Sequence, residues 1–435
     1  MSQPFGANYW RLWTASVISN FGDGLSSVAY PWLASAVTRS PLHIALVGVA
    51  TRLPWLVFTL PAGVITDRVD RRRLVVSMDC LRTLITLAVA IVVLGNQSAL
   101  ASPDEIATGL AAPPTSSVLL LATIYISALF FGMAEVLRDN AAQTLMPSVV
   151  VKENLEKANG RLWGAEMIMN SFAGPPVGGF LLAVAFSLPF FVDAGTFAVA
   201  AAMIAFLTGS FRPQGERQPS SFATDLKEGF RWLWGHQLLR RFAISLGLLN
   251  ASSSAAGATV VLFAQELLGL DATGFGLLAS AGAAGGVAGS FLAARLSKRL
   301  GSGGNLLVSL VLGGLASVVI GLTSNAPLVW LMYAIMAFGA VLWNVITVSL
   351  RQAIIPDRLL GRVNSVYRFF GWGMMPIGIF LGGVVVEVVA GLAGREVGLR
   401  APFFMAAAIN FVLTIYAFSR FSTTQIEQAK AEAAE

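Results

Sequence analysis

Residues 63–73 read GVITDRVDRRR and place two aspartates and four arginines between two long apolar runs. Charged side chains are costly inside a bilayer, so a short charged segment between apolar runs is typical of a hairpin that joins two membrane helices. The stretch therefore predicts that the chain crosses a membrane, and the sequence on either side extends that prediction.

The composition of the whole chain fits a bilayer. Of 435 residues, 56% are hydrophobic and 12% are charged, against roughly 25% charged in soluble domains. The mean hydropathy is +0.72. Helices satisfy their own backbone hydrogen bonds in lipid, and about 20 apolar residues cross a hydrocarbon core of ~30 Å. The sequence therefore predicts an all-α membrane protein.

Twelve apolar runs are long enough to cross the membrane as helices. They centre near Phe21, Val57, Leu84, Ile126, Phe172, Ala200, Gly257, Gly282, Leu312, Ala337, Ile379 and Ile409. No cleavable signal peptide is recognised, so the first run is expected to stay in the protein.

The basic residues predict the orientation of these runs. Of 29 Lys and Arg residues, Arg39, Arg395 and Arg400 fall on one side, Arg52 and Arg82 fall inside runs, and the others share the opposite side. Because basic loops stay cytoplasmic, both termini are expected in the cytoplasm. The net charge of +6 is then a topology signal, and no nucleic-acid partner is expected.

The two halves of the chain repeat the same order of motifs. A proline follows the fourth run at Pro147 and the tenth run at Pro356, and glycine-rich segments follow each of them. Such a repeat predicts two six-helix halves with a substrate route between them. The expected boundaries are 1–210 for the first half, 211–241 for a cytoplasmic linker, 242–421 for the second half and 422–435 for a cytoplasmic tail. Within the linker, 228–233 predicts either an amphipathic segment at the membrane surface or an extended loop.

Several motifs together carry a resemblance to a known family. They are Asn20-Phe21-Gly22-Asp23-Gly24, the Asp67-Arg68 hairpin, Pro147 and Pro356 after the fourth and tenth runs, and Glu228-Gly229-Phe230-Arg231. In their order and spacing they resemble the major facilitator superfamily, in the exporter branch that includes the enterobactin exporter and macrolide efflux proteins. The likeness runs almost end to end. One departure is Asp70, where the family's hairpin commonly has Gly, although Asp also tolerates turn conformations.

The resemblance implies a cytoplasmic gate built on the hairpin. Gly63 would let helices approach closely, and Asp67 would face the start of the eleventh run near Arg362. Arg68, Arg71 and Arg72 would pair with acids at the end of the fourth run. The wider gating group comprises Asp79, Arg82, Glu135, Arg138 and Asp139. The alternative for the arginines is simple anchoring at the cytoplasmic surface.

The fifth run contains Gly174-Pro175-Pro176-Val177-Gly178-Gly179. It resembles the fifth-helix motif of antiporters that export drugs, which implies efflux. Prolines are expected to kink the helix, and Gly174 and Gly178 lie on one face. Gly285 and Gly289 in the eighth run predict a matching surface, so the fifth and eighth runs are expected to pack closely. Ordinary tight packing is the alternative interpretation.

Charges inside the runs suggest where a proton could bind. Asp23 lies about 18 Å along its helix from Arg11, and Arg52 lies about 17 Å from the inner side, so the two share a depth. We expect an Asp23–Arg52 ion pair, with Asp23 as the first protonation candidate; a permanent structural pair is the alternative. Glu166 is a second candidate. Asp193 falls near the outer start of the sixth run and is interpreted as structural.

The family architecture implies that the first, fourth, seventh and tenth runs line the substrate route. Candidates on them are Asn20, Tyr30, Tyr125, Asn250, Trp343 and Asn344. Aromatic faces mixed with amides suit a large, mostly apolar molecule with a few polar groups. Aromatic residues in membrane helices also pack or anchor at interfaces, so packing is the alternative.

The sequence predicts a secondary transporter that exports hydrophobic or amphipathic small molecules of drug, macrolide or siderophore type by proton antiport and alternating access. No phosphate-binding loop, metal cluster or catalytic constellation is recognised, so no cofactor, no metal site and no enzymatic activity are expected. The alternatives are a lysophospholipid or lipid transporter and a transporter-like membrane sensor. The expected location is the bacterial cytoplasmic membrane, as a multi-pass monomer in contact with the lipid bilayer.

Overall fold

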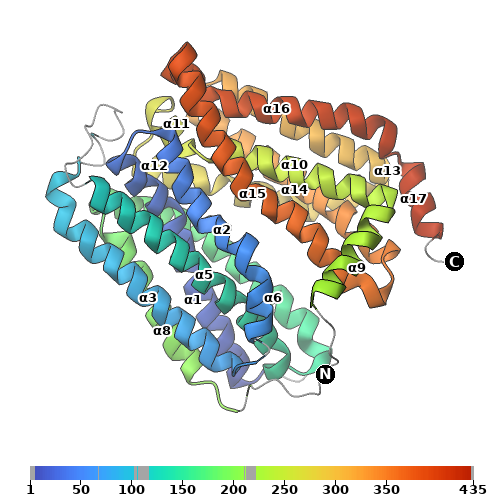
Figure 1. Ribbon diagram of the computed structural model, residues 1–435, viewed down its shortest axis with the longest axis horizontal. Helices are drawn as coiled ribbons and strands as arrows, with labels where there is room; N and C mark the ends of the chain where they lie inside the picture. Colours follow the sequence, from blue (N-terminus) through green and yellow to red (C-terminus); the bar gives the residue numbers. More distant parts are fainter. Residues whose placement is uncertain are drawn as a thin grey trace. The chain divides into compact units, whose positions relative to one another are not determined.

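The computed structural model describes residues 5–66, 68–101, 105, 117–209, 211 and 222–432. Helices joined by short turns make up nearly all of them (Figure 1). The first part holds α1 (Ala7–Val37), α2 (Pro41–Thr66), α3 (Arg71–Asn96), α5 (Ser117–Val149), α6 (Leu155–Met167), a π-helical turn (Ile168–Ala173), α7 (Gly174–Val184) and α8 (Leu188–Ala205). The second part holds α9 (Phe222–Gly235), α10 (Gln237–Gly257), α11 (Val260–Glu266), α12 (Ala272–Ala279), α13 (Ala281–Leu322), α14 (Ala326–Ile354), α15 (Asp357–Ala393), α16 (Arg395–Arg420) and α17 (Thr423–Glu432).

The chain divides into two compact units. The first unit is residues 1–216 together with Ala264–Ser280, and the second is Arg217–Phe263 together with Ala281–Glu435. The predicted 1–210 half therefore falls within the first unit. The short α12 also belongs to the first unit, although the sequence analysis assigned it to the second half. Arg39, just after α1, contacts the beginning of Ala264–Ser280. It forms an ion pair with Glu266 and donates to Gln265 Oε1 at 2.6 Å.

Ten helical segments of the described residues are long and apolar enough to cross a membrane, against the twelve that were predicted. One of the ten, Ala272–Leu322, has 51 residues. At 1.5 Å per residue it would run about 76 Å, more than twice the hydrocarbon thickness. Gly301 interrupts it with φ +71 and ψ 171, a left-handed conformation that favours glycine. The 31-residue α1 is absent from the ten, because serine, asparagine and aspartate dilute its apolar residues.

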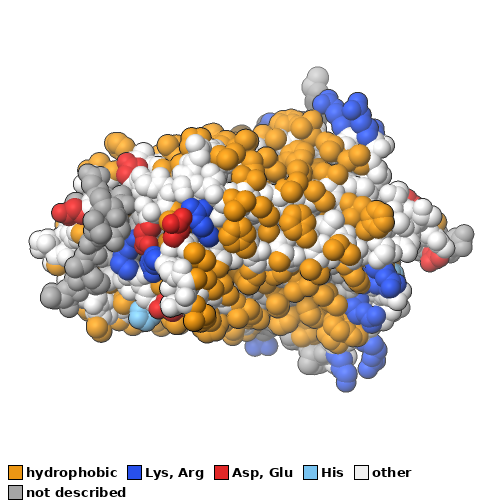
Figure 2. Space-filling model, turned by 90° about the horizontal axis from the view of Figure 1, so that it is seen from above, with side chains coloured by type: hydrophobic (Ala, Val, Ile, Leu, Met, Phe, Trp, Pro, Cys, Tyr) orange, Lys and Arg blue, Asp and Glu red, His pale blue; other side chains and the backbone are white. Residues whose placement is uncertain are grey.

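Large hydrophobic side chains remain exposed along the helices. Val118, Phe291, Ile415 and Phe418 each keep at least 74% of their surface accessible. Figure 2 shows hydrophobic side chains over much of the face that it draws. An exposed apolar surface of this kind faces lipid rather than water. The structure thus agrees with the composition in describing a membrane protein.

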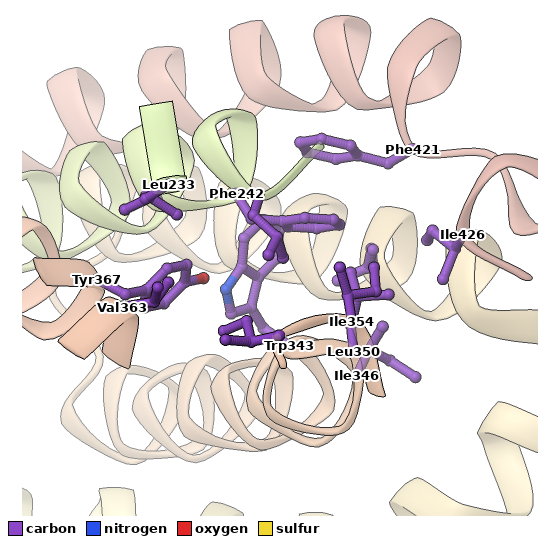
Figure 3. Close-up of a cluster of buried hydrophobic side chains, with 14 of the residues drawn as sticks. Leu233, Phe242, Trp343, Ile346, Leu350, Ile354, Val363, Tyr367, Phe421 and Ile426 are labelled. Atoms are coloured by element: carbon purple, nitrogen blue, oxygen red, sulfur yellow. The ribbon is translucent and has the colours of Figure 1, made fainter. Parts of the chain in front are cut away.

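The core of the second unit is aromatic and aliphatic. Phe242 of α10 stacks on Phe421 with ring centroids 4.2 Å apart, and Trp343 of α14 meets Phe242 edge-on (Figure 3). Leu350 and Val363 fill the space beside them and are fully buried. These contacts join α10, α14 and α15 in one packed cluster.

The predicted amphipathic segment of the linker forms part of a regular helix, α9, rather than an extended loop. Glu228 forms an ion pair with Arg362 of α15, and a Cβ on Gly229 would lie 2.7 Å from the Arg362 carbonyl oxygen. His236 follows α9 and caps α10, since its Nδ1 accepts from the Leu239 N–H at 3.3 Å. Burial lowers the pKa of His236, which favours the neutral imidazole that this cap requires.

Candidate functional site

A network of buried charges joins three helices of the first unit. Asp23 of α1 forms an ion pair with Arg82 of α3, and Arg82 Nη1 lies 3.4 Å from Asp79 Oδ1. Arg138 of α5 brings its Nε to 3.6 Å from the same Asp79 oxygen and donates to Asp139 Oδ1 at 3.1 Å. The side chains of Asp79, Arg82 and Arg138 are at most 3% exposed, whereas Asp23 is 14% exposed. Charges at this depth are tolerated because each acid faces a guanidinium.

The helix sequences explain why these side chains meet. Asp79 and Arg82 are three residues apart on α3 and so share one face. On α1, Ser19 accepts from Arg82 Nη1 at 3.0 Å, and Ser16 lies 3.5 Å from Arg138 Nη2. Serines at i and i+3, followed by Asp23 at i+7, form a polar stripe on α1. This stripe supplies the small hydrogen-bonding groups that two buried guanidiniums need.

Two aromatic rings cover the Arg82 guanidinium. Its central carbon lies 3.8 Å from the ring centroid of Phe197 on α8 and 4.7 Å from that of Phe131 on α5. Both distances allow cation–π attraction, which is stronger where water is excluded. Arg82 is thus held by two acids and by two rings, and within the part of the chain that the structure describes its Nε atom has no hydrogen-bond partner.

The predicted Asp23–Arg52 pair is wrong, because Asp23 pairs with Arg82. Arg52 lies on an exposed face of α2. Counting the helical rise gave the two residues the same depth, but it carries no information about which way a side chain points around its helix. The Asp79–Arg82 spacing was the signal for the true partner.

The remaining acids of the predicted gate and coupling groups lie around this network. Glu135 on α5 accepts from Trp55 Nε1 of α2 at 3.3 Å. Asp139 is one third exposed and pairs with its neighbour Arg138. Glu166 on α6 is partly buried, with the Ser16 hydroxyl and the Arg138 charge close to it. The structure therefore brings together Asp79, Arg82, Arg138 and Asp139, while Glu135 and Glu166 lie at the edge.

The hairpin arginines contact backbone carbonyls rather than the predicted acids Glu135 and Asp139. Arg71 Nη1 donates to the Thr144 carbonyl of α5 at 3.1 Å, and Arg72 Nη1 donates to the Leu207 carbonyl at 2.7 Å. A backbone carbonyl oxygen has two lone pairs, so it can accept from an arginine in addition to a backbone donor. Arg68 is exposed.

The other hairpin positions also differ from expectation. A Cβ on Gly63 would meet no heavy atom within 4 Å, so close helix packing at Gly63 is not seen within the described part of the first unit. Asp70 accepts from the Arg73 N–H at 3.0 Å and caps α3. The departure from Gly at this position therefore supplies a helix cap. Asp67 lies outside the described residues, and its contact with the eleventh run stays a prediction.

The glycine-proline motif packs α7 against α1 and α12. A Cβ on Gly174 would lie 2.6 Å from Gly24 Cα, and one on Gly178 would lie 2.9 Å from the Leu25 carbonyl oxygen. Gly179 faces α12, where a Cβ would overlap the Ala272 carbonyl and lie 3.1 Å from Gly276 Cα. Close packing of the motif on the start of the predicted eighth run is thus present.

The predicted partners of this motif, Gly285 and Gly289, lie elsewhere. Both face α14, where added Cβ atoms would meet Ala334 and Val341. The glycine that faces α7 is Gly276, which comes earlier, on the separate helix α12. Pro175 and Pro176 lack backbone N–H groups, and the π-helical turn Ile168–Ala173 directly precedes them, which accounts for the irregular helix at this point.

Three of the predicted substrate-lining residues lie in the first unit. Asn20 donates to the Ser16 carbonyl at 2.9 Å and lies 3.4 Å from the amide of Asn170. Tyr30 is 8% exposed and packs edge-on against Phe190. Tyr125 donates to the His43 carbonyl at 3.0 Å. Asn20 is the one that combines partial exposure with contacts near the charge network.

The other three lie in the second unit. Asn250 donates to the Gly371 carbonyl at 2.8 Å, which ties α10 to α15. Trp343 is only 3% exposed and belongs to the hydrophobic cluster of Figure 3. Asn344, the next residue, is exposed. Contact of these residues with a substrate remains a prediction.

Comparisons with known proteins point to one family. The sequence pattern of the family described as transmembrane secretion effector matches residues 3–434. The multidrug efflux pump Tap of Mycolicibacterium fortuitum is 26% identical over 413 residues, covering 92% of this chain and 94% of that protein. The enterobactin exporter EntS of Citrobacter koseri is 26% identical over 362 residues, covering 81% of this chain and 79% of that protein.

Solved structures agree at the level of the fold. A mutant form of the nucleoside transporter NupG matches with a TM-score of 0.72 and 11% identity, covering 95% of this chain and 100% of that one. A bacterial homologue of the iron transporter ferroportin in an inward-facing state matches with a TM-score of 0.69 and 17% identity, with coverage of 95% and 100%. The predicted superfamily is confirmed: the chain belongs to the transmembrane secretion effector family of major facilitator transporters and is a multi-pass bacterial membrane protein.

Proposed function

We propose that this chain is a secondary transporter that exports hydrophobic or amphipathic small molecules across the bacterial cytoplasmic membrane in exchange for protons. Its named relatives are a multidrug efflux pump and an enterobactin exporter, and they align with most of the chain. These names support a drug-like or siderophore-like substrate and outward transport. Membership of a transporter family also argues against an enzyme or a sensor.

The buried Asp23–Arg82 pair carries the proton-coupling part of the proposal. Of the two carboxylates that face Arg82, Asp23 is 14% exposed and Asp79 is 0% exposed, so water can reach Arg82's partner Asp23 but not Asp79. A proton on Asp23 removes its attraction for Arg82 and leaves the guanidinium with Asp79 alone. The local charge then rises by one in a region where an unbalanced charge is costly. Rearrangement of α1 against α3 relieves this imbalance and would drive the alternation of access.

The proposed topology has twelve spans with both termini in the cytoplasm. Gly301 separates two crossings within Ala272–Leu322, and α1 adds the remaining one to the ten apolar segments. With 31 residues, α1 is about 46 Å long and exceeds the hydrocarbon thickness, although it is less apolar than the other spans. The monomeric state, the proton as coupling ion and the absence of a cofactor belong to the same proposal.

The test is reconstitution of the purified protein in liposomes with an imposed pH gradient and a trapped pH-sensitive dye. A macrolide, a siderophore, a lipophilic dye and a lysolipid are compared as substrates. We expect a drug-like or siderophore-like substrate to move against its gradient and to dissipate the pH gradient. Flux of every substrate at a rate independent of the pH gradient would contradict proton antiport, and flux of the lysolipid alone would favour a lipid transporter.

The variant Asp23→Asn isolates the proposed coupling residue. It should reduce the rate of gradient-driven transport at least about tenfold, equivalent to about 1.4 kcal/mol in the transport barrier, while substrate exchange without a gradient continues. Glu156→Gln is the matched control, because Glu156 is an exposed acid on α6. Full gradient-driven transport in Asp23→Asn would show that coupling resides elsewhere.

A further inference from the structure

Asp193 is a second buried acid that the charge network leaves without a cation. It is the sixth residue of α8 and is 0% exposed. The Ser26 hydroxyl of α1 donates to its Oδ2, and the Thr196 hydroxyl lies 3.4 Å from its Oδ1. Among the described residues, no Lys, Arg or His nitrogen lies within ion-pair distance of this carboxyl.

The helix terminus cannot provide the missing positive charge. The sequence analysis interpreted Asp193 as an acid at a favourable helix N-terminus, but α8 begins at Leu188, so Asp193 lies beyond the first turn. The effect of the helix dipole falls off within that turn. An ionised carboxylate here would be fully desolvated with only hydroxyl donors around it, which is far more costly than a neutral acid. Burial without a paired cation therefore favours a carboxylic acid that carries its proton.

The position of Asp193 links it to the Asp23–Arg82 pair. A Cβ on Gly22 would overlap Asp193 Oδ1, so the carboxyl lies against the α1 backbone directly before Asp23. Phe197, one turn further along α8, lies under the Arg82 guanidinium at 3.8 Å. The charged groups that act on Asp193 are Asp23 from α1 and Arg82 from α3, and α7 contributes none.

We propose that Asp193 holds a proton while Asp23 is paired with Arg82, and that the two acids exchange roles during transport. This inference rests on the proposed proton antiport. A proton binds to a carboxylate oxygen of Asp23 and frees the guanidinium, which turns about Phe197 towards α8. The O–H bond of Asp193 then breaks, its proton leaves along the Ser26 hydroxyl to water, and the carboxylate pairs with Arg82. One proton is taken up and one is released, so the buried charge is unchanged.

Two features of the geometry support this exchange of Arg82 between Asp23 and Asp193. The Arg82 Nε–H is buried and has no acceptor among the described residues, so the guanidinium retains a donor for a new partner. Ser26 lies three residues beyond Asp23 on the same helix, which places both oxygen-bearing groups along one side of α1. The polar stripe of α1 thus continues from the Arg138 contact at Ser16 to the Asp193 contact at Ser26.

Infrared spectroscopy of the purified protein in nanodiscs at neutral pH tests the protonation directly, without transport. We expect a carbonyl stretch of a protonated carboxylic acid in the wild-type protein, shifted by isotope-labelled aspartate, retained in the control Glu156→Gln and lost in Asp193→Asn. Asp23→Asn imitates a protonated Asp23 and frees Arg82 for Asp193, so the band should weaken in that variant. Because asparagine is close in shape to a protonated aspartic acid, Asp193→Asn should fold normally. Absence of the band from the wild-type protein, or its persistence in Asp193→Asn, overturns the inference.

Proteoliposome transport then separates this inference from the proposed function. Asp193→Asn should lose gradient-driven export at least about tenfold while exchange without a gradient continues, and Glu156→Gln should behave as the wild type. Gradient-driven export that is equal in Asp193→Asn and the wild-type protein would overturn the role of Asp193 and leave proton antiport standing. A wild-type protein that shows the infrared band but no gradient-driven export would instead reject the proposed function.

Discussion

The arginines of the first unit contact two kinds of partner, carboxylates and backbone carbonyls. The kind of partner determines how much each arginine contributes to the stability of the fold. Arg82 and Arg138 face carboxylates in the interior of the first unit, whereas Arg71 and Arg72 face backbone carbonyls of α5 and of the segment after α8. A buried pair that loses one member leaves an uncompensated charge. A backbone carbonyl that loses an arginine donor loses one neutral acceptor contact and leaves no unpaired charge.

Substituting Arg82 should therefore cost more stability than substituting Arg72. Arg82→Gln strands Asp23, leaves Asp79 with Arg138 alone and should destabilise the folded protein by about 3–5 kcal/mol. Arg72→Gln, the matched control, removes one hydrogen bond and should cost about 1 kcal/mol. Thermal unfolding in detergent gives the order of the two variants. In the background of Arg82→Gln, adding Asp23→Asn should restore part of the loss, and a further loss of the same size would contradict the pairing.

The sequence predicted which residues are charged within the membrane but not which of them meet. Helical rise suggested that Asp23 and Arg52 lie at the same depth, yet Asp23 pairs with Arg82, and Arg52 is exposed. Which neighbour a side chain faces depends on how its helix is rotated about its own axis. Packing between helices determines that rotation, and a single sequence does not reveal it. The i,i+3 spacing of Asp79 and Arg82 contained part of the answer, because it required both side chains to lie on one face of α3.

At the scale of helices, α1 is the least typical span and the most connected one. Ser16, Ser19, Asp23 and Ser26 bind Arg138, Arg82 and Asp193, and these same residues reduce its hydropathy. The glycine motif of α7 reveals a similar limit of prediction. Its close packing followed from the sequence, but Gly179 meets Gly276 of α12 rather than Gly285 or Gly289. Glycine spacing marks a surface for close packing without specifying the partner.

Gly179 offers a test of the contact between α7 and α12. In Gly179→Ala the added methyl group overlaps the Ala272 carbonyl, which belongs to the backbone and cannot move aside as a side chain would. We expect loss of stability of about 1–3 kcal/mol from overpacking and a several-fold slower transport rate. Gly195→Ala on α8 is the control, because a Cβ there meets nothing within 4 Å. Equal thermal unfolding and transport in the two variants would mean that this contact is not important.

At the scale of the molecule, the repeat of motifs predicted two halves, and contacts also divide the chain into two units. The assignments differ at Ala264–Ser280, which groups with the first unit because α12 packs on α7 and Glu266 pairs with Arg39. A linear repeat identifies where the chain passes from one half to the next. It does not identify a segment such as Ala264–Ser280 that belongs to the other unit, because side-chain contacts and not the order of the sequence decide to which unit a segment belongs.

The proposed topology can be tested with single cysteines, because the chain has one native cysteine, the exposed Cys80. In a Cys80→Ser background, His43→Cys follows α1 at the predicted outer side, while Glu156→Cys and Gln428→Cys lie at predicted cytoplasmic positions. All three native residues are exposed. A membrane-impermeant maleimide added to intact cells should label His43→Cys at least about tenfold faster than the other two, since only basic-poor loops are expected outside. Permeabilised cells should label all three, which controls for reactivity.

Labelling of Gln428→Cys together with His43→Cys in intact cells would require an even number of crossings between the two positions. The proposed topology has an odd number there, so that result would show that a crossing after α1, such as the one added by the break at Gly301, has been miscounted.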